Sequence, residues 1–88
     1  MEYNELEFRQ TSPACPEQYD VFNKENEQVG YVRLRWGVLR CDYPKCGART
    51  IYEFVFPDKT DGSFLSEEQR AKYLDIIAGK IKAHEVSM

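Results

Sequence analysis

The pattern of hydrophobic and polar positions is most regular in residues 29–43, VGYVRLRWGVLRCDY, where it predicts a β-hairpin. Trp36 and Gly37 form its expected two-residue turn, because Gly37 readily adopts the positive φ that such a turn needs. Side chains alternate along each strand, so this turn sorts the hairpin into two faces. The hydrophobic face holds Val32, Leu34, Leu39, Cys41 and Tyr43. The opposite face holds Tyr31, Arg33, Arg35, Val38, Arg40 and Asp42, with Arg33 directly opposite Arg40.

Two further segments are expected to extend this sheet. A strand at residues 19–23 continues the hydrophobic face with Tyr19 and Val21, and it places Phe22 opposite Val29 on the other side. We name that other side, with Phe22 and Val29 included, the arginine face. A strand at residues 50–56 alternates again, and its aromatic row is predicted to face the core: Tyr52, Phe54 and Phe56.

A C-terminal helix is predicted from both its start signal and its periodicity. The sequence SEEQ at residues 66–69 has the form of a capping box, in which Ser66 covers a free backbone N–H and Gln69 reaches back. A hydrophobic stripe with helical spacing follows: Leu74, Ile77, Ala78 and Ile81. The helix should therefore pack on the hydrophobic face of the sheet.

The fold class predicted from these elements is α+β. It consists of an antiparallel sheet of four or five strands in meander order, with one C-terminal α-helix packed on one face. Residues 1–18 are expected to form an N-terminal arm, or an edge strand near residues 5–9 followed by a proline-containing linker. Residues 19–88 are expected to form a single domain of sheet and helix.

Length and charge restrict the possibilities further. A chain of 88 residues has room for one core, and no apolar run approaches the roughly 18 residues that would span a bilayer. The expectation is a cytoplasmic protein without a membrane partner. Residues 29–49 hold five basic residues and one acidic residue, a local charge of +4, whereas the whole chain has a formal charge of −3. A long-range attraction to polyanions is therefore not expected, although a local basic surface is.

Sequence signals for catalysis or metal binding are weak. Three cysteines and one histidine, Cys15, Cys41, Cys46 and His84, could supply a zinc site, but the spacing of Cys41 and Cys46 is wider than in a zinc knuckle. The hairpin pattern also places Cys41 in the core. No nucleophile has a base near it in the sequence, and no phosphate-binding loop is present. The chain is therefore expected to be neither an enzyme nor a cofactor binder.

The arginine face carries the functional hypothesis. Its candidate binding residues are Phe22, Tyr31, Arg33, Arg35 and Arg40. This mixture of aromatic and guanidinium groups suits a protein partner or self-association, which the acidic total charge favours. Nucleic-acid binding through the hairpin arginines and a small zinc-stabilised domain are the alternatives. Against all three stands a surface without function, in which Asp20, Asp42 and Glu53 neutralise the arginines.

Overall fold

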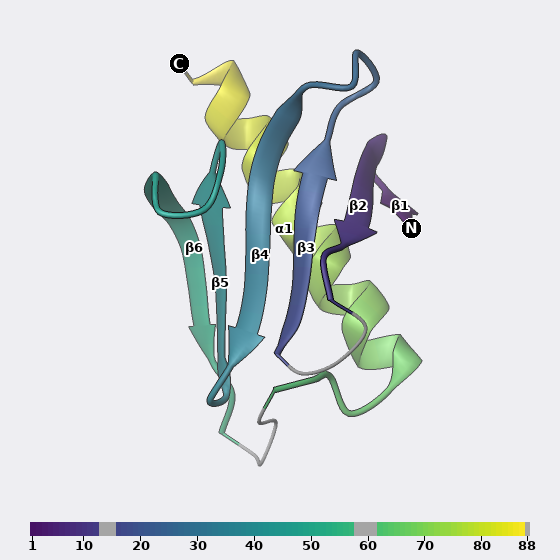
Figure 1. Ribbon diagram of the computed structural model, residues 1–88, viewed down its shortest axis with the longest axis vertical. Helices are drawn as coiled ribbons and strands as arrows, with labels where there is room; N and C mark the ends of the chain where they lie inside the picture. Colours follow the sequence, from purple (N-terminus) through teal and green to yellow (C-terminus); the bar gives the residue numbers. More distant parts are fainter. Residues whose placement is uncertain (13–15, 58–61, 88) are drawn as a thin grey trace.

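A computed structural model describes residues 1–12, 16–57 and 62–87 of the chain. It shows an antiparallel sheet in meander order with one helix crossing behind it (Figure 1). The strands are β1 (Glu2–Tyr3), β2 (Leu6–Gln10), β3 (Glu17–Phe22), β4 (Gln28–Arg35), β5 (Val38–Tyr43) and β6 (Arg49–Val55), and the helix is α1 (Glu67–Val86). The predicted α+β class, meander order and C-terminal helix are confirmed, and the strand count is six instead of four or five.

The central hairpin has the predicted turn and the predicted register. Trp36 and Gly37 both have positive φ, 55° and 74°, which matches the right-handed twist of the flanking strands. β4 and β5 pair residue by residue as the alternation indicates, with Leu34 opposite Leu39 and Arg33 opposite Arg40. The hydrophobic and arginine faces therefore lie on opposite sides of the sheet.

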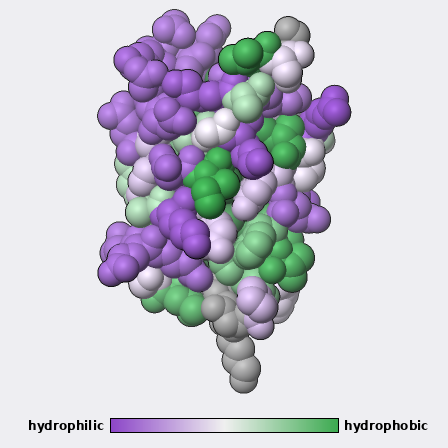
Figure 2. Space-filling model, turned by 180° about the vertical axis from the view of Figure 1, so that it is seen from behind, coloured by the Kyte–Doolittle hydropathy of each residue, from purple (hydrophilic) through white to green (hydrophobic). Residues whose placement is uncertain are grey.

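The core lies between the hydrophobic face and α1. Ser66 caps the helix, its side chain accepting from the N–H of Gln69 at 3.1 Å, and the Oε1 of Gln69 accepts from the N–H of Leu65. The predicted stripe is fully buried: Leu74, Ile77, Ala78 and Ile81. The surface of the molecule on the side of α1 is mainly hydrophilic, with hydrophobic residues in separate patches (Figure 2). The helix thus covers one face of the sheet only.

The first ten residues form two strands: β2, which corresponds to the edge strand expected near residues 5–9, and β1, which is additional. Leu6 and Phe8 are buried, and β2 pairs with β3 over the length of its alternation. Asn4 and Glu5 take positive φ values of 53° and 69°, and this turn folds the short β1 back onto β2. A left-handed conformation in non-glycine residues leaves little trace in a sequence, so β1 was not predicted.

The expectation that Val29 shares the arginine face is wrong. The pairing of β3 and β4 shifts between Val21 and Phe22, so that Phe22 pairs with Gln28 and Val29 is the extra residue of a β-bulge. The bulge turns Val29 toward the hydrophobic core, where only 4% of it is exposed. Val21 still pairs with Gly30, as predicted.

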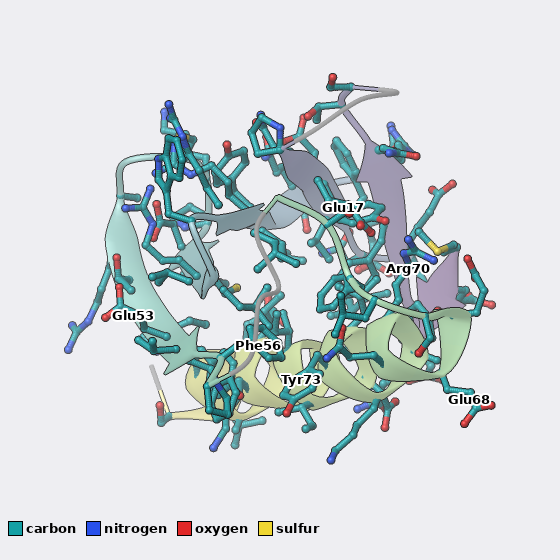
Figure 3. All side chains as sticks on the ribbon, turned by 90° about the horizontal axis from the view of Figure 1, so that it is seen from below. Glu17, Glu53, Phe56, Glu68, Arg70 and Tyr73 are labelled. Carbon is teal, nitrogen blue, oxygen red and sulfur yellow. The ribbon has the colours of Figure 1, made fainter. Side chains whose placement is uncertain are left out.

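A buried ion pair fixes the start of the helix against the sheet. Glu17, 5% exposed, accepts from Arg70 Nε at 2.5 Å, from the Tyr19 hydroxyl at 2.5 Å and from the Phe64 N–H at 3.1 Å. Figure 3 shows Glu17 and Arg70 meeting between the sheet and α1. Burial raises the pKa of Glu17, but these hydrogen bonds outweigh burial and leave that pKa below its ordinary value. Arg70 also pairs with the exposed Glu67.

Candidate binding surface on the arginine face

One end of the arginine face is covered by the chain itself. The loop between β5 and β6 lies over it, and the N–H of Gly47 donates to Asp42 Oδ2 at 3.0 Å. The Thr50 hydroxyl donates to Asp42 Oδ1 at 2.8 Å. Asp42 is only 2% exposed, and both of its carboxylate oxygens therefore accept a hydrogen bond from within the chain. Tyr31 is 7% exposed, and its hydroxyl donates to Gln18 at 2.6 Å. Burial raises the pKa of that hydroxyl. Tyr31 is therefore a structural residue at this end and not a contact surface.

Phe22 is also less accessible than the sequence indicates. The guanidinium of Arg9 lies 3.9 Å from the centre of the Phe22 ring, within the range of a cation–π contact. Arg9 is held there by Asn26 and by Glu7, with which it forms a salt bridge of 2.9 Å. Two of the five predicted binding residues, Phe22 and Tyr31, thus interact within the chain.

The other three predicted residues come together at the hairpin end of the sheet. They line an open hollow of about 200 Å³, to which the turn and β6 also contribute. Its lining consists of Arg33, Arg35, Trp36, Val38, Arg40 and Glu53. We name it the arginine hollow. Strands β4 and β5 fix its floor, because their register sets Arg33 beside Arg40 and Arg35 beside Val38.

The three arginines of the hollow differ in their electrostatic partners. Arg40 lies near Asp42, with Nε and Oδ1 separated by 3.4 Å, and its Nε is buried without a hydrogen bond. Arg33 and Arg35 have no ion-pair partner anywhere in residues 1–12, 16–57 or 62–87. Of the three acids expected to neutralise this face, Asp42 alone forms a salt bridge with a described arginine. The hollow therefore presents two unpaired guanidinium groups beside one another.

Trp36 belongs to the hollow although sequence reasoning treated it only as a turn residue. It is 75% exposed, and the Arg35 guanidinium lies 5.9 Å from its ring centre. A large aromatic residue in a tight turn that requires positive φ is locally unfavourable. The unusual choice of tryptophan at a position with positive φ was therefore the feature of the sequence that could have indicated a role for Trp36 beyond the turn.

The candidate metal ligands that the structure describes are Cys41, Cys46 and His84. Cys41 is fully buried in the core, and burial raises the pKa of its thiol to about 12, which keeps it protonated at neutral pH. Cys46 is exposed in the loop after β5, and His84 packs against Tyr43 near the end of α1, with ring centres 4.7 Å apart. Cys15 lies outside the described residues. Among the residues that are described, no three histidine, cysteine or carboxylate side chains are grouped to hold a metal ion.

Three further findings complete the description of this protein. Within the described ranges, no helix combines the length and the hydrophobicity needed to cross a bilayer. The arginine hollow is open to solvent on the side of the sheet that α1 leaves uncovered. Searches against protein-family models, curated proteins and solved structures found no match to this chain.

Proposed function

We propose that this protein is a non-enzymatic binding module that uses the arginine hollow to hold an acidic segment of a protein partner. The observation that carries the proposal is the pair of unpaired guanidinium groups, Arg33 and Arg35, beside the exposed Trp36. Arginine forms paired hydrogen bonds with carboxylates, and tryptophan supplies apolar contact area. Both residue types are common at the energetic centres of protein interfaces.

The like-charge pair in the hollow supports a functional reading. Arg33 lies directly opposite Arg40, an arrangement that costs a few tenths of a kcal/mol in a strand pair. Asp42 offsets the charge of Arg40 but not that of Arg33. A bound carboxylate would remove this repulsion, so the free protein holds an arrangement that a ligand improves.

Nucleic acid is the second candidate, because guanidinium groups beside an exposed indole can also receive phosphates and bases. The charge distribution favours the protein partner. Glu53 stands at the rim of the hollow without an ion-pair partner in the described chain, and the whole chain has a formal charge of −3. A phosphate backbone would meet the repulsion of the net negative charge along its length, whereas a short acidic segment bound to Arg33 and Arg35 would meet mainly that of Glu53.

The test compares two variants that each remove positive charge. Arg33→Gln with Arg35→Gln changes the hollow, and Lys45→Gln changes an exposed cation in the loop after β5. The probe is a labelled peptide of alternating glutamate and proline, which carries the charge but cannot pair as a strand. Fluorescence polarisation should show binding at least about tenfold weaker for the double variant, a loss of roughly 1.4 kcal/mol, with Lys45→Gln near wild type.

Two results would overturn the proposal. One is equal binding of the probe by the wild type and the double variant. The other is tighter binding of a mixed-sequence RNA or DNA oligonucleotide, with a steep salt dependence that the double variant flattens. The second result would replace the protein partner with nucleic acid.

A further inference from the structure

Strand β6 is a long edge of the sheet to which no other described strand is paired. It spans seven residues, Arg49–Val55, and pairs only with β5. The opposite edge, β1, has two residues. Figure 1 shows β6 at the margin of the sheet with no ribbon along its outer side. A long edge strand presents backbone groups that another extended chain can pair with.

The outward backbone groups of β6 follow from the pairing on its inner side. The N–H of Phe56 donates to the carbonyl of Gly37 at 2.9 Å, so the backbone N–H of Phe56 points inward, toward the central hairpin. Alternate residues of an antiparallel strand point their N–H and C=O groups in opposite directions. Val55 and Glu53 therefore direct theirs outward. Val55 is also 65% exposed.

Two lysines of α1 lie close to the aromatic residues on the helix side of β6. Lys80 Nζ lies 6.0 Å from the ring centre of Tyr52, and Lys72 Nζ lies 5.4 Å from that of Tyr73. Tyr73 in turn packs on Phe54, with ring centres 5.3 Å apart. Neither lysine forms a salt bridge with a described residue. Two unpaired ammonium groups thus flank the aromatic side of this edge strand.

The arginine-face side of the same strand has a different character. Glu53 and Val55 point there, beside Arg40 and Val38 on β5. Figure 3 shows Glu53 on the outer side of β6, away from α1. Because Glu53 is unpaired in the described chain, an incoming acidic side chain on this side would be repelled, whereas an apolar one could cover Val55.

We propose that β6 adds an extended segment of a protein partner as a seventh strand, with acidic side chains toward Lys72 and Lys80 and apolar side chains against Val55. This inference rests on the proposed function only in that the partner is a protein; it assigns a second contact, next to the arginine hollow. Main-chain hydrogen bonds supply affinity in such strand addition, and alternate side chains supply specificity.

A second copy of the chain fits this edge less well. Antiparallel pairing of β6 with another β6 about a two-fold axis would continue the sheet and place both helices on the same side. Lys72 and Lys80 of each copy would then approach the same cations of the other. The charges therefore favour an acidic partner.

The experiment uses a labelled peptide in which glutamate alternates with valine, and fluorescence polarisation as the readout. Val55→Pro removes the outward N–H of β6 without removing a bond inside the sheet, and Val55→Thr is the matched control that keeps this N–H. We expect binding to be at least about tenfold weaker for Val55→Pro and within about twofold of wild type for Val55→Thr. Lys72→Gln with Lys80→Gln should weaken binding and reduce its dependence on salt.

Three outcomes would overturn the inference. One is a wild type that does not bind the glutamate–valine peptide, or binds equally well a peptide in which lysine replaces glutamate. Another is binding that Val55→Pro leaves unchanged; if Arg33→Gln with Arg35→Gln then abolishes it, the hollow stands as the site and the edge does not. The third is a wild-type dimer in sedimentation that Val55→Pro dissociates, which would assign the edge to a second copy.

Discussion

Replacing Glu17 with glutamine should destabilise the fold strongly, although its buried side chain lies on the opposite side of the sheet from the arginine hollow. Its carboxylate is 5% exposed and receives hydrogen bonds from Arg70, from the Tyr19 hydroxyl and from the Phe64 N–H. A glutamine keeps one acceptor oxygen but turns an N–H₂ group toward some of these donors. The guanidinium of Arg70, 19% exposed at the side chain, would then lose its buried partner.

The size of the effect follows from how deeply the pair is buried. Breaking a fully buried ion pair by removing one partner costs about 3–5 kcal/mol. Arg70 is partly exposed and keeps its contact with Glu67, so we expect about 2–3 kcal/mol for Glu17→Gln. At about 4–8 °C per kcal/mol for a domain of this size, the melting temperature should fall by roughly 10–20 °C.

Urea denaturation at pH 7 measures this loss, with Glu67→Gln as the matched control. Glu67 contacts the same guanidinium, but its side chain is 89% exposed, so its removal should change the free energy of unfolding by less than about 0.5 kcal/mol. Replacing both Glu17 and Arg70 with methionine should cost less than Glu17→Gln alone, because no buried charge is left unpaired. Equal denaturation midpoints for Glu17→Gln and Glu67→Gln would refute the reasoning.

The remaining predictions concern pH, the helix cap, the packing of the helix against Gly30 and the hollow. The pKa of Glu17 is lowered in the fold, so its contribution is complete above its ordinary pKa of 4.5 and lost as pH falls through the lower folded value; the difference between wild type and Glu17→Gln in urea should stay constant from about pH 7 to 5 and shrink below 4.5. Ser66→Ala should lower the free energy of unfolding by about 1 kcal/mol, and an unchanged midpoint would contradict its role as the cap. Gly30→Ala should destabilise by about 1–3 kcal/mol, because the new Cβ would lie 2.7 Å from Ile81 Cδ1 in a fully buried site; thermal unfolding at or above the wild-type temperature would contradict this. Arg40→Gln should cost about 1–2 kcal/mol in urea, since it leaves a buried carboxylate without its cation, and a value near zero would show that the pair is immaterial.

Much of the fold could be predicted from the sequence because strands that follow one another along the chain also lie next to one another in the sheet. A meander requires only that each strand pair with the next, and the alternation around Trp36 and Gly37 fixes the register of the central pair. The helix could be predicted from its capping residue Ser66 and from its hydrophobic stripe. Two details of the local backbone geometry could not be predicted from the sequence. A bulge moved Val29 into the core, and left-handed residues at Asn4 and Glu5 created β1.

The candidate site was harder to predict because exposure depends on loops. The sequence placed Arg33, Arg35 and Arg40 on one face, and the structure brings them together in the hollow. It could not show that Tyr31 is buried, with Cys46 of the loop after β5 close to its hydroxyl. Nor could it show which arginine an acid would pair with, because the direction of long side chains is set by packing and not by register.

The order of elements has a consequence for how this chain is made. A ribosome releases the N-terminal end first, so the six strands emerge before α1, and each hairpin can close as soon as its second strand appears. During that interval the hydrophobic face of the sheet has no cover, because Leu74, Ile77 and Ile81 are still to come. The nascent sheet is then open to chaperones or to other unfolded chains. A stop codon or a proteolytic cut before residue 67 would make that interval permanent, turning a folding intermediate into a species that aggregates.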